Sequence, residues 1–146
     1  MKRMAAFLLA GLFLGGVFAG CVFQPEPSSS EDGNVLVEER GVTVTYAGME
    51  MTEEGGLELT FRVENQGDKP LLLNVQEFSA NGCSMAAFFA SETAPGETAQ
   101  DILTASSGEL ERYGLTTVEE VSFFLVVFHG DTLERILTTE QLHVDL

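Results

Sequence analysis

The chain has 146 residues, of which 45% are hydrophobic, and its 7 basic side chains stand against 23 acidic ones, which gives a formal net charge of −16. Such a charge repels nucleic acids and anionic lipid headgroups, so we expect neither as a partner. The length accommodates one domain with a short appendage, and it excludes a second independent core.

The N-terminal segment has the three-part organisation of a bacterial secretory signal. A basic start, Lys2-Arg3, is followed by an apolar run over residues 4–18, and the small residues 19–20 then precede Cys21. This order predicts export of the chain and removal of the segment.

The stretch Val17-Phe18-Ala19-Gly20-Cys21 resembles the lipobox of bacterial lipoproteins. By that resemblance, a diacylglyceryl group is attached to the Cys21 thiol and cleavage follows Gly20. Two alternatives stay open, which are ordinary cleavage without a lipid and retention of the apolar run as an uncleaved anchor. All three place the rest of the chain outside the cytoplasm.

Removal of residues 1–20 leaves 146 − 20 = 126 residues, and their charge is 5 − 23 = −18 because Lys2 and Arg3 leave with the signal. With a lipid on Cys21, Cys83 has no partner, and we interpret it as a small buried apolar residue. A disulfide between the two cysteines requires the lipobox interpretation to be wrong.

Residues 21–33 follow the cleavage point and contain two prolines, three consecutive serines and three acidic residues. Such a composition buries too little apolar surface to offset the entropy of ordering. We therefore predict a lipidated Cys21 followed by a flexible linker, and a folded domain over residues 34–146.

From Asn34 onward, apolar and polar residues alternate, which is typical of strands with one buried face. The alternation is regular over residues 42–46 and 57–63. Between them, the segment 52–56 ends in two glycines, which tolerate the positive φ angles of turns. The pattern predicts a hairpin.

The middle of the chain predicts further strands separated by turns. A strand over residues 71–80 leads to Asn81-Gly82, which is a strong signal for a two-residue hairpin turn, and a strand over residues 83–89 follows. Residues 94–97, Ala-Pro-Gly-Glu, predict a type II turn before a strand over residues 98–104.

One short helix is predicted after these strands. Ser106 with Glu109 three positions later fits a capping box, Leu110 can face the core, and Gly114 suits the position after the helix.

The C-terminal part predicts the central strand of the fold at residues 118–128. Both alternating sets of its second half are apolar, so we expect burial on both faces. A turn at residues 129–131 and closing strands at residues 133–137 and 142–146 follow.

Roughly seven to nine short strands with turns between them favour an all-β fold, an antiparallel immunoglobulin-like β-sandwich with one short helix. A small closed barrel is the alternative.

Several of these segments together resemble the immunoglobulin-like (telokin-like) domains of Firmicute surface lipoproteins. The resemblance covers about residues 42–146 and is carried by residues 59–71, 81–82, 94–96 and 115–121. It implies an extracytoplasmic β-sandwich. Because that family is largely of unknown function, it implies no catalytic residues.

Motifs of catalysis are missing from the sequence. It has no Gly-x-Ser-x-Gly, no His-Glu-x-x-His, no phosphate-binding glycine loop and no Cys-x-x-Cys. We interpret His129 and His143 as turn or edge residues, and the acid pairs at 38–39, 53–54 and 119–120 as turn residues. We therefore predict no enzyme, no cofactor and no metal site, although a weak calcium site stays open.

The sequence thus predicts a non-catalytic binding or accessory module of the cell envelope, held at the membrane by the lipid on Cys21. An envelope protein is one partner that this allows, and the oligomeric state stays open. The alternative is a carrier domain for a small ligand or ion.

The candidate partner-binding residues are Met85, Phe88 and Phe89. Neighbouring residues of a strand point to opposite faces, so one of Phe88 and Phe89 is expected in the core and the other outside, unless another segment covers it. An exposed ring beside the adaptable Met85 would suit a partner contact, by packing or by strand addition along that edge.

Overall fold

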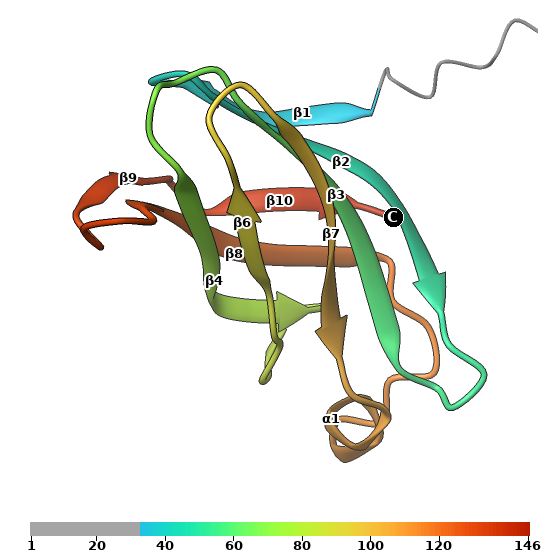
Figure 1. Cartoon of the computed structure of the whole chain (residues 1–146). Helices are drawn as coiled ribbons and strands as arrows, with labels where there is room; N and C mark the ends of the chain where they lie inside the picture. Colours follow the sequence, from blue (N-terminus) through green and yellow to red (C-terminus); the bar gives the residue numbers. More distant parts are fainter. Residues whose placement is uncertain (1–32) are drawn as a thin grey trace, which may run out of the picture.

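The computed structural model describes residues 33–146, in which two antiparallel sheets pack face to face around one hydrophobic core (Figure 1). The predicted all-β sandwich with one short helix is confirmed. The predicted signal peptide, Cys21 and nearly all of the linker lie outside the described residues. The elements, in chain order, are β1 (Asn34–Glu39), β2 (Val42–Met51), β3 (Leu57–Asn65), β4 (Leu71–Ala80), β5 (Cys83–Ser84), β6 (Ala90–Thr93), β7 (Thr98–Ala105), α1 (Ser107–Arg112), β8 (Glu120–His129), β9 (Arg135–Thr138) and β10 (Leu142–Asp145).

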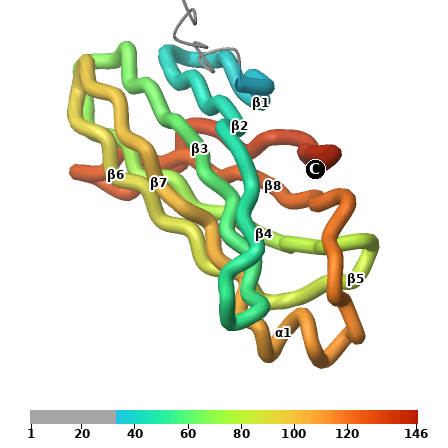
Figure 2. Tube along the Cα trace, turned by 90° about the vertical axis from the view of Figure 1, so that its right-hand side faces the viewer, coloured from blue at the N-terminus to red at the C-terminus, as the bar shows by residue number. Residues whose placement is uncertain are grey.

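The first sheet has the strand order β1-β2-β3-β7, and the second has the order β10-β8-β4-β5, with β6 also paired to β4 and β9 also paired to β8. Strands β6 and β7 follow each other in the chain but belong to different sheets, and Figures 1 and 2 show them side by side. The turn between them therefore crosses from one sheet to the other. It has the predicted form, because the Glu97 N–H donates to the Ala94 carbonyl at 3.1 Å and Gly96 has φ +74°.

The predicted hairpins form at both places. Strands β2 and β3 pair in antiparallel register, with Val44 opposite Val63. Along β3 buried and half-buried residues alternate without a break, as the sequence predicts. Strands β4 and β5 are joined by Asn81 and Gly82, whose φ angles of 47° and 77° are those of the expected turn.

The core lies between the two sheets and is centred on Phe61 of β3. The Phe61 ring meets Phe123 of β8 at 5.6 Å between centroids and Phe89 at 5.4 Å, both edge to face. Such aromatic pairs add to the stabilisation that burial alone provides. The largest fully buried side chains around them are Leu57, Leu59, Leu73, Leu103, Leu110, Leu125, Val42, Val44, Val63 and Val121.

Strand β8 is central, as predicted, because β4 pairs along one edge and β10 and β9 pair along the other. Its inner face is buried, but its outer face is only partly so. Val126 on the outer face is 1% exposed, whereas Phe124 and Phe128 are half-buried. The prediction of full burial on both faces is therefore wrong for these two rings. The Arg135 guanidinium lies over the Phe128 ring at 5.9 Å and covers part of it.

The predicted strand over residues 83–89 is wrong, since β5 ends at Ser84. The Met85 N–H bonds the Phe78 carbonyl at 3.0 Å, in the register that pairs Ser84 with Ser79. Beyond this bond the chain leaves β4, and Phe88 pairs with Thr104 of β7 in the other sheet.

Two further strand predictions need correction. The first closing strand begins at Arg135 and not at Leu133, because Leu133 has φ +57° and belongs to the turn that follows β8. The described part of the chain has ten strands, above the roughly seven to nine expected. The edge strand β1 and the short strand β6, for which no separate strands were predicted, account for the excess.

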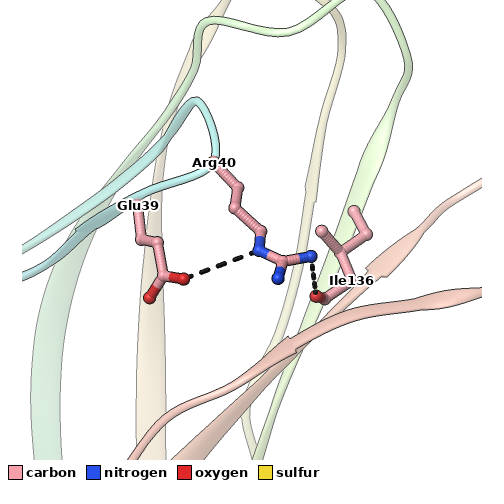
Figure 3. A network of polar contacts seen from close by, with 3 residues as sticks. All are labelled: Glu39, Arg40 and Ile136. Carbon is pink, nitrogen blue, oxygen red and sulfur yellow. Dashed lines mark hydrogen bonds and ion pairs between the residues drawn. The ribbon is translucent and has the colours of Figure 1, made fainter.

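Strand β1 is joined to β2 by Arg40 and Gly41, both with positive φ. The Arg40 side chain reaches across to the second sheet, where Nη1 donates to the Ile136 carbonyl at 3.2 Å (Figure 3). Its Nε lies 3.5 Å from a carboxylate oxygen of Glu39 in β1. This exposed contact links the first hairpin to β9.

Helix α1 forms as predicted, with Ser106 as its N-cap: the Ser106 Oγ accepts from the Glu109 N–H at 3.3 Å. Gly114 ends it at φ +67°, and the Leu115 N–H bonds the Leu110 carbonyl at 2.9 Å. Leu110, 1% exposed, fixes the helix to the core.

Candidate functional site

The candidate site is a cavity of about 550 Å³ at one end of the sandwich. Four parts of the chain surround it: the β2–β3 turn with the start of β3, the loop between β5 and β6, the end of β7, and the start of α1. Figures 1 and 2 show the β2–β3 turn and α1 at this same end of the molecule. Its size falls within the range of about 300–1,000 Å³ that is usual for small-molecule sites.

The cavity lining combines one large aromatic ring with carboxylates, hydroxyls and small apolar groups. The lining residues are Thr52, Glu54, Gly56, Leu57, Glu58, Ala86, Ala87, Phe88, Thr104, Ala105, Ser106, Ser107 and Glu109.

Phe88 is the most exposed large hydrophobic residue in the described part of the chain, at 70% exposure. Its backbone is fixed, because the Phe88 N–H donates to the Thr104 carbonyl at 2.8 Å and the Thr104 N–H donates back at 2.9 Å. The ring therefore projects from an anchored backbone. Because both backbone groups of Phe88 are used, the predicted strand addition has no free pairing position at this residue.

The other two candidate residues lie in the core. Phe89 is 5% exposed and packs on Phe61, and Met85 is 8% exposed. One of the two neighbouring rings thus enters the core while the other faces outward, and the alternative, in which another segment covers the second ring, is wrong. The expectation that Met85 lies beside the exposed ring as a surface contact is wrong, since burial removes its side chain from any partner.

Glu109 ties the loop to the helix. Its Oε2 accepts a hydrogen bond from the Ala86 N–H at 3.2 Å. In a capping box this carboxylate would reach back to the N-cap residue, whereas here it binds the neighbouring loop. The loop that carries Phe88 is therefore held on one side by β7 and on the other by α1.

The charged side chains that line the cavity are all acidic. Glu54, Glu58 and Glu109 line it, and none of the lining residues is basic. Sequence reasoning missed this group, since it interpreted Glu54 as a turn residue and Glu109 as a capping residue. No local signal could reveal it, because Glu109 belongs to a segment that meets Glu54 and Glu58 of the first hairpin only in the fold.

The remaining chemistry-bearing residues lie elsewhere. His129 ends β8 beside a turn, and His143 is exposed on β10, which confirms their interpretation as turn and edge residues. Cys83 is free and only half-buried, so the prediction of a buried thiol holds only in part. Across residues 33–146, no three histidine, cysteine, aspartate or glutamate side chains are grouped so that they could hold a metal ion.

Burial affects one titrating group clearly: desolvation raises the pKa of the Tyr46 hydroxyl above its ordinary value. Tyr46 packs against Phe61 with ring centroids 6.0 Å apart and does not line the cavity. In the same described part of the chain, no helix has the length and hydrophobicity needed to cross a membrane.

The geometry defines a class of protein, an antiparallel β-sandwich with a pocket at one end. No protein-family model matches the chain, and no curated protein matches it. Among solved structures, it is similar to a FixG-related protein from Vibrio parahaemolyticus with a TM-score of 0.41 and 11% identity, over 74% of this chain and 94% of that one. No conclusion about function follows from that similarity.

Proposed function

We propose that the protein is an extracytoplasmic lipoprotein whose sandwich is a non-catalytic binding module of the cell envelope. The observation that carries the binding role is Phe88, a large ring 70% exposed beside a cavity of about 550 Å³. When a partner covers an aromatic ring that a fixed backbone holds in water, the free energy of binding becomes more favourable. Such rings contribute much of the binding energy at interfaces.

The anchoring half of the proposal is supported by the sequence around Cys21. A basic start, an apolar run and two small residues before the cysteine match the order of a lipoprotein signal. The linker that follows would let the sandwich stand off the bilayer and turn its cavity toward other envelope components. The resemblance to immunoglobulin-like domains of Firmicute surface lipoproteins supports the same location.

A carrier of small ligands is the second candidate, and the cavity volume favours it. The volume gives room for a small molecule, and carboxylates with hydroxyls such as Thr52 and Thr104 could orient one. The binding module is preferred because the Phe88 ring is 70% exposed at the cavity, and a macromolecular surface covers so exposed a ring better than a small molecule does.

The experiment is site-specific photo-crosslinking in intact cells. A photoreactive residue replaces Ala86 or Ser107 in the cavity lining, and in a control it replaces Thr138 on β9. We expect a defined envelope component to crosslink from both cavity positions and not from the control.

The same crosslinks are then compared after Phe88→Ser and after Ile102→Ser, its matched control. Ile102 is also an exposed apolar residue, at 48%, but it does not line the cavity. Loss of the crosslink with Phe88→Ser alone supports the proposal. Equal crosslinking from all positions, or equal effects of both substitutions, contradicts it.

A further inference from the structure

The chemistry of the cavity selects its occupant by charge. Glu54, Glu58 and Glu109 contribute three carboxylates to a lining without a single basic side chain. The five basic residues of the described part of the chain all lie elsewhere, at Arg40, Arg62, Lys69, Arg112 and Arg135. The potential in the cavity is therefore negative, and an anionic occupant is repelled.

The three carboxylates do not converge on one point. No group of three acidic, thiol or imidazole side chains in residues 33–146 is placed to hold a metal ion. An occupant that neutralises the lining is therefore more extended than a bare cation. It needs charged or hydrogen-bonding groups that are separated in space.

Phe88 adds a second requirement, because the face of an aromatic ring attracts a cation and also packs against alkyl chains. A lysine or arginine side chain has both parts, a cationic head and an apolar stem. Arginine suits the site best, since its planar guanidinium can stack on the ring and donate to carboxylates at the same time.

We propose that the cavity binds a basic segment of a partner protein, with an arginine or lysine side chain packed on the Phe88 ring and directed at the carboxylates of Glu58 and Glu109. This rests on the proposed binding function and adds the class of ligand to it. The two hydrogen bonds of Phe88 to Thr104 and the bond from Ala86 to Glu109 hold the site in place before the partner arrives, which lowers the entropic cost of binding.

The test is a titration of the full chain in detergent, followed by NMR of backbone amides. The probe is a short glycine–serine peptide with two central arginines, and the control is the same peptide with glutamine in both places. We expect the arginine peptide to shift the amides of Ala86, Ala87 and Phe88, to bind more weakly at high salt, and the glutamine peptide to have no effect.

Variants then assign the contacts. Phe88→Ser and Glu58→Gln should each weaken binding of the arginine peptide roughly tenfold. Glu92→Gln, an acid on β6 outside the cavity lining, should leave binding unchanged. Thermal unfolding of each variant is measured alongside, so that a loss of binding is separated from a loss of fold.

Several outcomes overturn this inference. Equal binding of the glutamine peptide would show that charge does not select the occupant. Amide shifts spread over all surface acids would show non-specific attraction. The same local amide shifts with calcium chloride alone would show a metal site. If the peptides fail but cavity crosslinking still depends on Phe88, the ligand class is wrong and the binding module stands. If both fail, the proposed function is wrong as well.

Discussion

Phe88 and Phe89 are neighbours in the chain, yet one ring is 70% exposed and the other 5%. The alternation of side chains along an extended segment explains the division, because adjacent residues point to opposite sides. It does not explain which ring goes inside. That choice is made by Phe61, whose ring lies across the core and meets Phe89 edge to face at 5.4 Å.

Substitution separates the two roles. Phe89→Ser removes a buried ring and leaves a cavity, which should lower the free energy of unfolding by about 3–5 kcal/mol. Phe88→Ser should change it by about 0.5 kcal/mol or less, since the lost ring is mostly in water. Chemical denaturation of both variants measures the difference. Similar losses for the two would show that both rings belong to the core and that the cavity has no exposed anchor.

Some single residues have structural roles that the sequence does not predict. Asn65 at the end of β3 is 2% exposed, and its amide donates to the carbonyls of Lys69 at 2.8 Å and Thr93 at 3.1 Å. A buried amide with such partners joins the β3–β4 connection to β6. Its partners are set by the fold, so composition and spacing cannot reveal them.

At the scale of elements, local sequence patterns predict strands correctly where one face of the strand is buried. They predict turns correctly where the turn requires a particular residue type. Asn81-Gly82 is the clearest case, because both residues take positive φ as predicted. The same Asn81 side chain also accepts from the Glu119 N–H at 2.8 Å and donates to the Thr117 carbonyl at 2.9 Å. This second role, which fixes the start of β8, is invisible in the sequence.

Element predictions failed where long-range bonds compete with local pattern. Residues 83–89 carry no charge and are mostly apolar, so they suit a strand, but β5 ends at Ser84. The Ala86 N–H bonds the Glu109 carboxylate of the helix, and Phe88 pairs with Thr104 of the other sheet. Neither partner is encoded in the segment itself.

The central position of β8 gives a prediction for this element. Leu125 is 2% exposed and faces the core, so Leu125→Asp places an unpaired charge there and should cost several kcal/mol, comparable to the whole stability of a small domain. Circular dichroism should show unfolding, or the protein should aggregate.

Glu64→Gln on β3 serves as the control for Leu125→Asp. It removes an ion pair with Arg62 at 2.9 Å whose side chains are both 30% exposed, and such pairs contribute about 0–1 kcal/mol. Comparable losses for the two variants, or a spectrum dominated by helix, would contradict the sandwich.

At the scale of the whole molecule, the cavity exists only because the two sheets bring the β2–β3 turn, the β5–β6 loop and α1 to one end. The sequence predicted the sandwich that makes this possible and named Phe88 as a candidate. It could not predict the carboxylates that share the cavity with Phe88, since their grouping depends on how the sheets stack and where the helix docks.

Both proposals depend on where the molecule works, because an extracytoplasmic location decides which partners reach the cavity. The direct measurement is metabolic labelling with a fatty-acid analogue in living cells, comparing the native chain with Cys21→Ala and with Cys83→Ala as the matched control. The account predicts that the native chain and Cys83→Ala carry the label and that Cys21→Ala carries none. Persistent labelling of Cys21→Ala, or an unlabelled native chain, would contradict the lipid anchor on Cys21.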